Sequence, residues 1–198
     1  MRIALACLKP TENTAQNVRL LLHSLDALED SADLIVFGKR FLNDERSAPL
    51  EAENPLFEAV CEAARRYHTG ISFGFCERTP NGVSDVQLVI GPDGKILCKM
   101  KQDETAAFSL GGKSFVLSEC GEAAVAYPAA DAVLWPLNRT CNPTAWNSVT
   151  KFDYMRRASQ SARQVLLVNT PGGALHTQDG RIRLELPCGE QGYLFANL

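Results

Sequence analysis

The 198-residue sequence lacks several features that mark common classes of protein. No apolar run approaches the roughly 20 residues that a membrane-spanning helix needs, and the apolar stretch within residues 1–8 is too short for a secretory signal. The 20 basic residues are scattered along a chain of net charge -3, so no basic stripe follows a phosphate backbone. We therefore expect a cytoplasmic protein with no nucleic-acid partner and no membrane partner.

Metal and cofactor motifs are missing as well. The seven cysteines contain no CxxC pair, and no cysteine or acidic residue stands at helical or hairpin spacing from any of the three histidines. Gly172 and Gly173 belong to neither a GxGxxG nor a GxxxxGK pattern. The sequence therefore predicts no metal and no cofactor. Most of the cysteines should be free thiols, since a disulfide framework is unusual in a chain of this size.

The composition that is present suits a globular fold with a substantial core. Hydrophobic residues make up 45% of the chain and charged residues 22%. No repeat, low-complexity tract or linker divides the sequence, so we expect a single domain over residues 1–198.

The apolar periodicity predicts an alternation of strands and helices. Helices are expected after residues 10–13, from Asn54 to just before Gly70, and from about residue 144 or 148 to residue 163. The turn at residues 91–94 predicts a hairpin between 86–90 and 95–100. Further strands are expected at 2–8, 33–37, 71–76, 114–117, 132–135 and 165–168, and near 181–186 and 193–196. This order describes a mixed sheet, or a pair of sheets, covered by helices.

Several segments, in the same order, resemble the nitrilase or carbon-nitrogen hydrolase superfamily. The first half of the family pattern is similar to Arg2–Ala6 with Asn17, to residues 32–37 and 71–75, and to residues 89–97. The second half is similar to residues 112–122, 130–136 and 157–169. The resemblance implies an α/β fold, a four-layer α-β-β-α sandwich of two mixed sheets.

The chemistry of that family needs three residues. A cysteine attacks an amide or nitrile carbon, a glutamate carries the thiol proton to the leaving ammonia, and a lysine stabilises the oxyanion. The resemblance places Lys39 at the glutamate position. A charged lysine cannot accept the thiol proton and can only draw a nearby cysteine toward thiolate. Ordinary turnover is therefore not expected.

The position of the family's lysine is occupied by Gln102, a neutral and weaker donor to an oxyanion. Lys101, one residue earlier, lies on the opposite face of a strand unless a bulge re-aims it. Glu77, Asp103 and Glu104 stand near strand ends, where one of them could replace the missing base. Solvated loop carboxylates are the more common outcome for such residues.

Cys120 is the candidate nucleophile. It follows a predicted strand and precedes Gly121 and Glu122, much as the family's cysteine precedes an acidic residue, and Glu122 is a further candidate for proton transfer. A second alignment takes residues 124–127 as the strand and places Pro128 at the nucleophile position. Packing as a small buried hydrophobe would explain Cys120 equally well.

The remaining histidines and tryptophans have structural explanations. We expect His68 at a helix end, His23 on a helix surface and His176 in a loop. Trp135 and Trp146 are expected to pack in the core rather than to line a ligand pocket.

Three functions stay open on the sequence. The first is a nitrilase-like protein with a degraded active site, weak or absent hydrolysis of amides and nitriles, and a retained site for a small amide or carboxylate ligand or for a partner. The second is a divergent amidase that keeps Cys120 and recruits Lys39, Lys101, Glu77 or Glu122. The third is a structural subunit of an oligomer, and a homodimer is one predicted assembly.

Overall fold

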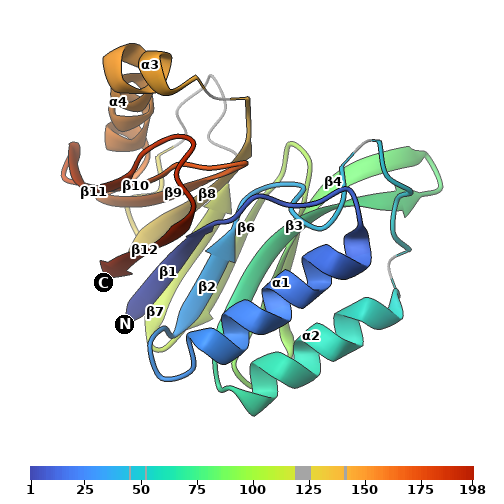
Figure 1. The fold of residues 1–198 in the computed structure, drawn as a ribbon. Helices are drawn as coiled ribbons and strands as arrows, with labels where there is room; N and C mark the ends of the chain where they lie inside the picture. Colours follow the sequence, from blue (N-terminus) through green and yellow to red (C-terminus); the bar gives the residue numbers. More distant parts are fainter. Residues whose placement is uncertain (45, 52, 119–125, 141) are drawn as a thin grey trace.

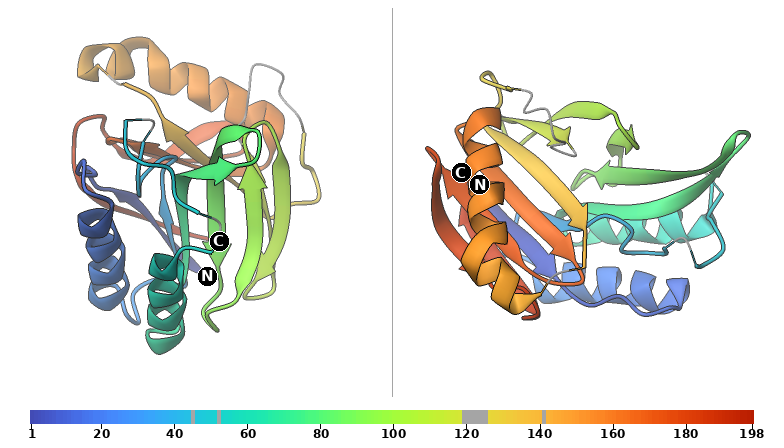
Figure 2. Two further views of the ribbon diagram at one scale, coloured as in Figure 1. Left: turned by 90° about the vertical axis from the view of Figure 1, so that its right-hand side faces the viewer. Right: turned by 90° about the horizontal axis from the view of Figure 1, so that it is seen from above.

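The computed structural model describes residues 1–44, 46–51, 53–118, 126–140 and 142–198. The strands form two six-stranded sheets, each mixed in direction, with helices on their outer faces (Figures 1 and 2). The predicted α/β sandwich of two mixed sheets is confirmed.

The first sheet has the strand order β12-β1-β2-β3-β4-β5. β1, β2 and β3 run parallel to one another, whereas β12, β4 and β5 pair antiparallel with their neighbours. Its strands are β1 (Arg2–Cys7), β2 (Leu34–Phe37), β3 (Gly70–Thr79), β4 (Gly82–Ile90), β5 (Ile96–Lys101) and β12 (Gly192–Asn197). Every residue of β2 is buried, as expected for a parallel strand covered on both faces.

The second sheet has the strand order β11-β10-β9-β8-β7-β6. β7, β8 and β9 are parallel, and the outer strands pair antiparallel. Its strands are β6 (Thr105–Leu110), β7 (Lys113–Ser118), β8 (Ala132–Asn138), β9 (Gln164–Thr170), β10 (Ala174–Gln178) and β11 (Arg181–Leu186).

Helices α1 (Thr14–Ala27) and α2 (Pro55–Arg66) cover the first sheet. The Asn54 side chain accepts from Leu56 N and Pro55 follows it, so the predicted cap and first-turn proline are both present. Over the second sheet lie α3 (Pro143–Ala145), a π-helical turn (Trp146–Thr150) and α4 (Lys151–Ser161), which form one continuous helical segment. None of the described helices is long and apolar enough to span a membrane.

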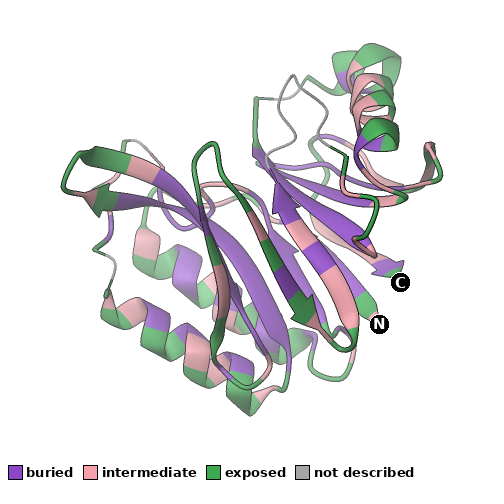
Figure 3. Cartoon of the chain, turned by 180° about the vertical axis from the view of Figure 1, so that it is seen from behind, coloured by how far each residue is buried: buried purple, intermediate pink, exposed green. Residues whose placement is uncertain are grey.

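Apolar side chains pack in three layers. Figure 3 colours the buried residues of the strands and helices purple. One layer joins α1 and α2 to the first sheet, and includes Leu21, Val60 and Phe73. The middle layer lies between the sheets, and includes Val36, Phe115 and Leu134. The third joins the second sheet to the helical segment, and includes Trp135, Trp146 and Leu167. These layers give the predicted α-β-β-α order.

Two strands of the second sheet were not predicted, and one of them overturns an expectation. His176 lies in β10 rather than in a loop, is 5% exposed, and its Nε2 lies 3.1 Å from Gln164 Oε1. The polar sequence of β10 after Leu175 hides the alternation that marks a strand. β6 is a short strand with exposed positions, and it escapes the same pattern.

The cysteines match the expectation in part. Cys7, Cys61, Cys76 and Cys98 are free, whereas Cys188 is disulfide-bonded.

The expectations for His23 and His68 hold, because both are exposed, His23 on α1 and His68 just beyond α2. Trp135 and Trp146 are buried in the layer under α4, as expected.

Candidate functional site

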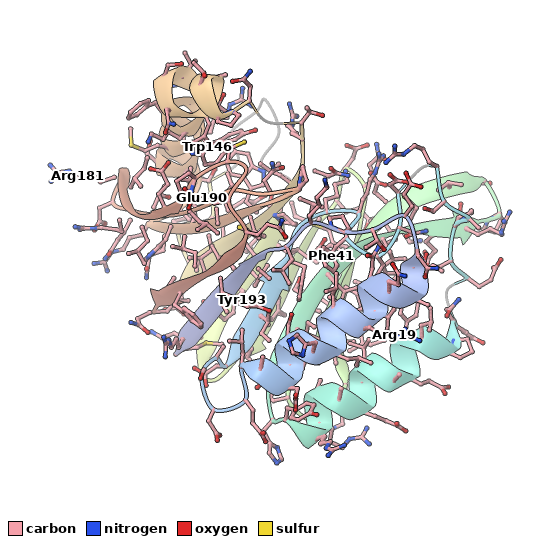
Figure 4. The ribbon with its side chains drawn as sticks, viewed as in Figure 1. Arg19, Phe41, Trp146, Arg181, Glu190 and Tyr193 are labelled. Carbon is pink, nitrogen blue, oxygen red and sulfur yellow. The ribbon has the colours of Figure 1, made fainter. Side chains whose placement is uncertain are left out.

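The loop after β2 contacts strands of both sheets, β8 near its carboxyl end and β3 near its middle. Lys39 N donates a hydrogen bond of 3.1 Å to Leu137 O on β8, and Leu42 N donates one of 3.0 Å to Gly74 O on β3. Phe41, between these anchors, is buried and packs on Phe37 with ring centroids 4.5 Å apart; Figure 4 labels it beyond the end of β2, beside β3. Carboxyl ends of parallel strands are the usual location of ligand sites in α/β folds.

Asn43 fixes the far side of this loop. Its Oδ1 accepts from Cys76 N at 2.8 Å, and its Nδ2 donates to Cys76 O at 3.2 Å and to Ala48 O at 3.0 Å. A buried amide that is satisfied in this way holds the loop against β3. Residues 38–43 are therefore positioned by backbone contacts before any ligand binds.

Two glycines make this close approach possible. A Cβ on Gly38 would lie 2.2 Å from Thr170 Oγ1 and 2.7 Å from Leu137 O, so only glycine fits between the two sheets there. A Cβ on Gly74 would lie 2.5 Å from Arg40 N. Arg40 itself has a φ of 56°, a left-handed conformation that is uncommon for a residue other than glycine and that is often found at functional sites.

Lys39 and Arg40 both bind the carboxylate of Asp85 on β4. Lys39 Nζ lies 2.9 Å from Asp85 Oδ2, and Arg40 Nε donates to Asp85 Oδ1 at 2.7 Å. Asp85 is 5% exposed, whereas the side chains of Lys39 and Arg40 are 17% and 27% exposed. We call Lys39, Arg40 and Asp85 the charge cluster.

The charge cluster keeps Asp85 ionised. Burial raises the pKa of the Asp85 carboxyl, but hydrogen bonds and charge attraction from Arg40 and Lys39 outweigh burial, so its pKa lies below the ordinary 3.8. At neutral pH the carboxylate acts as a counter-ion of the two cations. A carboxylate with a lowered pKa is a weak proton acceptor.

The register of β3 and β4 places Asp85 in the space between the two sheets. Asp85 pairs with Cys76, and Gln87 pairs with Gly74. Because strand side chains alternate, these residues lie opposite Val86, which packs toward the helices. Gln87 Nε2 donates to Phe37 O and to Ser72 Oγ, both at 3.0 Å, and so supports the end of β2.

Cys76 is the thiol nearest to the charge cluster among the described residues. Its Sγ lies 3.5 Å from Asp85 Oδ1 and donates to it. Burial, followed by the charge of Asp85, raises the pKa of the Cys76 thiol to about 12. A buried thiol that stays protonated is not a nucleophile at neutral pH.

Gln102 and Lys101 occupy different places relative to the charge cluster. Gln102 N donates to Asp85 O at 2.9 Å, so the backbone of Gln102 lies beside the cluster. Lys101 pairs with Val86 in the β4–β5 ladder, which puts its side chain on the helix-facing side of the sheet, and it is exposed. The only irregularity in that ladder lies between Val89 and Ile90, so no bulge re-aims Lys101.

The carboxylates considered as replacement bases lie elsewhere. Glu77 is buried and paired with Lys99 Nζ, which comes from β5. Glu104 Oε2 accepts from Lys101 N at 3.1 Å, and Glu104 and Asp103 are exposed in the turn after β5. The described partners of Glu77 and Glu104 come from β5.

Cys120 and Glu122 lie outside the described residues. The strand ahead of them, β7, is present and ends at Ser118. Pro128 lies in an exposed turn in which Ala130 N donates to Tyr127 O at 3.2 Å. The strand predicted for the second alignment is not seen at Ala126 and Tyr127, the described part of that segment.

Sequence reasoning missed Asp85 and Arg40. The alternation in β4 offered a signal, because Asp85 and Gln87 alternate with the apolar residues Val86 and Leu88. Such a pattern places polar groups inside a sandwich, where they need partners. Arg40 gave no comparable signal, since it lies in a loop and has a left-handed backbone conformation.

The chemistry available at this site is therefore ionic and hydrogen-bonding. No group of three or more histidine, cysteine, aspartate or glutamate side chains is close enough to hold a metal ion in the described part of the chain. The charge cluster offers partly exposed cations above a buried counter-ion.

The sequence matches the pattern of one protein family. The sequence pattern described as carbon-nitrogen hydrolase matches residues 2–134. A comparison with curated protein sequences finds no match.

Solved structures of similar fold include amidases from Nesterenkonia. A cysteine-to-alanine mutant of the Nesterenkonia AN1 amidase from the nitrilase superfamily has a TM-score of 0.75 and 18% identity, covering 100% of this chain and 90% of that one. The NitN amidase has a TM-score of 0.75 and 17% identity, covering 100% and 92%. A double mutant of the same amidase, in complex with acrylamide, has a TM-score of 0.75 and 16% identity, covering 100% and 90%. With the sequence match over more than half of its length, this chain belongs to the carbon-nitrogen hydrolase family.

Proposed function

We propose that this protein binds a small amide or carboxylate ligand at the charge cluster and hydrolyses carbon-nitrogen bonds weakly or not at all. The observation that carries the proposal is the ion pair of Lys39 with Asp85. At the position where the family has a proton-accepting glutamate, this chain presents an ammonium group bound to a buried carboxylate.

Proton transfer and oxyanion stabilisation are both weakened in this arrangement. Asp85 has a lowered pKa and already accepts from Arg40 Nε and Cys76 Sγ, so it is a poor general base for a thiol. Gln102 is uncharged, and a neutral donor stabilises an oxyanion less well than an ammonium group. Both deficits act on the same step, the attack of Cys120 on a carbonyl or nitrile carbon.

The test is ammonia release from a panel of short aliphatic amides and nitriles. We expect the purified protein to release no more ammonia than its Cys120→Ser variant. Turnover that is abolished by Cys120→Ser would overturn the proposal and support the divergent amidase instead. A clear rate in the Lys39→Glu, Asp85→Asn, Gln102→Lys triple variant would show that these positions block the chemistry.

Thiol labelling supplies a second test. A catalytic cysteine is partly ionised near neutral pH and reacts rapidly with iodoacetamide. We expect Cys120 to react no faster than Cys61, whose pKa burial raises above the ordinary 9.0. Preferential labelling of Cys120, mapped by peptide mass, would contradict the proposed loss of activity.

The homodimer stays a prediction. Val149 and Phe152 are 65% and 48% exposed on the helical segment over the second sheet. If this face joins two copies, replacing both residues with serine will halve the mass measured by light scattering. A dimeric mass that survives both changes would exclude this face, and a monomeric unmodified protein would exclude the assembly.

The cytoplasmic location of this protein also stays a prediction. The disulfide at Cys188 argues against it, because disulfides are rare where thiols are kept reduced. Counting reactive thiols in unfolded protein, taken from cells without added reductant, tests whether this disulfide forms there.

A further inference from the structure

We infer that protonation of His176 releases β11 from the second sheet and, through Glu185, loosens the helical segment that covers this sheet. This acid-sensitive device is separate from the charge cluster and does not depend on the proposed function. His176 is 5% exposed, whereas the other two histidines, His23 and His68, are exposed. Histidine changes its charge between about pH 5 and 8, so a buried histidine couples packing to acidity.

The ring of His176 lies in the layer between the two sheets. His176 pairs with Leu166 on β9, and partners in an antiparallel ladder share a face of the sheet. Leu166 belongs to the layer between the sheets. His176 Nε2 lies 3.1 Å from Gln164 Oε1, so the neutral ring carries its hydrogen on Nε2. Nδ1 is buried and has no hydrogen-bond partner among the described residues. A proton added at Nδ1 would find no acceptor there.

The charges around His176 oppose its protonation. Burial, followed by the positive charge of Arg183 on β11, lowers the pKa of His176 below the ordinary 6.5. The partner on β9, Gln164, is neutral. From the first sheet, β1 and β12 contact β10 and present apolar residues such as Ile3 and Ala196 to this layer. Helix α4 packs on the other face of β10. An imidazolium at this position would therefore be buried without a counter-ion among the described groups.

The strand next to His176 is held by an irregular ladder. β11 is the edge strand of the second sheet (Figure 1). Thr177 pairs with Ile182. His176 pairs with Leu184, which leaves Arg183 as the extra residue of a bulge. Leu184, directly opposite the imidazole, is 40% exposed. Segments with exposed side chains at a sheet edge open at a lower free-energy cost than core strands. Opening of β11 gives the imidazole access to water, where it can take up a proton.

Glu185 connects β11 to the helical segment over the second sheet. Glu185 follows Leu184, and its Oε1 accepts from Trp146 Nε1 at 2.8 Å. Its Oε2 lies 2.9 Å from Lys151 Nζ, and the two side chains of this ion pair are 22% and 17% exposed. When β11 leaves the sheet, the carboxylate is withdrawn from both partners. Residues 143–161 then lose these polar contacts to the sheet, and we expect the helical segment to open with β11.

Hydrogen exchange measured by mass spectrometry tests this inference. The open form takes up a proton at the ordinary pKa of histidine and the closed form only at a lower pH, so opening becomes easier as pH falls below 6.5. Between pH 7.5 and pH 5.5, we expect protection in β11 and in residues 143–161, corrected for intrinsic exchange rates, to fall about fivefold to tenfold. Unchanged protection in β11 would overturn the inference.

The first sheet shows whether the opening is local. At both pH values, we expect protection in β1 and β2 to stay at least about tenfold higher than in β11, because these core strands exchange through a larger unfolding event. If β1, β2, β11 and residues 143–161 all exchanged with one protection factor, opening would be global, and the release of β11 as a separate unit would be wrong.

His176→Gln removes the titrating ring and keeps an N–H group that can donate to Gln164. We expect the change in β11 protection between pH 7.5 and pH 5.5 to shrink to less than about twofold in this variant. A fall that persists in full would come from other titrating groups and would exclude His176. His176→Asn, which is smaller, gives the same test if His176→Gln does not fold.

His23→Gln and His68→Gln are the matched controls. Both histidines are exposed, on α1 and just beyond α2, so we expect either variant to keep the full fivefold to tenfold fall, within about a factor of two. Loss of the response in one of these controls would assign it to an exposed histidine instead of His176.

Glu185→Gln tests the connection to the helical segment. The variant removes the charge that holds Lys151 and leaves His176 in place. We expect β11 to keep its pH response, whereas the response of residues 143–161 should fall to less than about twofold, because the two segments then open separately. A full response of the helical segment in this variant would show that Glu185 does not transmit the release.

Discussion

Two buried carboxylates on neighbouring strands show two ways of holding a charge inside this molecule. Glu77 on β3 pairs with Lys99 on β5, so both partners belong to one sheet and lie on the same helix-facing side. Asp85 on β4 lies between the sheets, and its partners Lys39 and Arg40 come from the loop after β2. The first pair depends on strand register, whereas the second depends on a loop that contacts both sheets.

This difference decides what each pair contributes. A pair set by register needs only the sheet, and its lysine reaches solvent, with 32% of the side chain exposed. The charge cluster needs the positions of two sheets, two glycines and a left-handed residue to agree. Arrangements that require so many local conditions are more often functional than stabilising.

The largest effect should come from removing the carboxylate of the charge cluster. Asp85→Ala leaves Lys39 and Arg40 partly buried without their shared counter-ion, which we expect to lower the free energy of unfolding by about 3–5 kcal/mol. Urea denaturation, followed by far-ultraviolet circular dichroism, measures the change. A loss below about 1 kcal/mol would mean that Asp85 contributes no more to stability than a carboxylate in an exposed salt bridge.

A methyl group on Gly74 should have the next largest effect. Its Cβ would lie 2.5 Å from the backbone nitrogen of Arg40, which cannot move without disturbing the loop. We expect Gly74→Ala to lower the free energy of unfolding by about 2–3 kcal/mol, as overpacking does in a close-packed interior.

Gly91→Ala is the control for this steric effect. A Cβ there would lie 3.1 Å from Asp93 Oδ1 and 3.2 Å from Leu97 Cδ2, both at the ends of side chains that can give way. The same denaturation measurement should show a loss of less than about 1 kcal/mol. Equal losses at the two glycines would mean that the contact with Arg40 is not what restricts Gly74.

Removing the other carboxylate should have a smaller effect. Glu77→Ala leaves Lys99 with access to water, so we expect the free energy of unfolding to fall by about 1–2 kcal/mol. Comparing the loss of unfolding free energy in Glu77→Ala with that in Asp85→Ala shows which of the two buried carboxylates contributes more to stability. If Glu77→Ala proved the more damaging change, the register-determined pair would be the stronger one.

The smallest effect is the pH dependence of the contribution of Asp85. Its folded-state pKa lies below 3.8, so its stabilising contribution is complete above that pH and is lost as pH falls through the lower, folded-state value. The difference in unfolding free energy between the unmodified protein and Asp85→Asn should therefore shrink below pH 3.8. A difference that stays constant down to pH 2 would contradict the lowered pKa.

Much of the fold was predictable because it depends on local patterns. Apolar runs marked β1, β2 and β9, and the cap at Asn54 marked the start of α2 within one residue. β6, an edge strand, and β10, which lies between β11 and β9, escaped prediction because their polar or exposed positions leave little apolar alternation. Their pairing is set by neighbours distant in sequence.

Within the charge cluster, only Lys39 was predicted from the sequence. Lys39 follows the strongly apolar strand β2, so the sequence alone predicts that it lies just beyond the carboxyl end of that strand. Its partner Asp85 is 46 residues away along the chain, and the ion pair exists because β2, β3 and β4 stand in that order. Single-sequence reasoning has no access to a pairing of this range.

The contact at Gly38 ties the position of Lys39 to the separation of the two sheets. Backbone atoms of β8 and the hydroxyl of Thr170 on β9 lie where a side chain at residue 38 would stand, so neither sheet can slide without carrying the ammonium group along. Attempts to retune ligand preference need not target the charged residues themselves. A bulkier residue at position 170 would push on Gly38 and so move the Lys39 ammonium group relative to the Asp85 carboxylate. Such a change would alter ligand preference without replacing a charged residue.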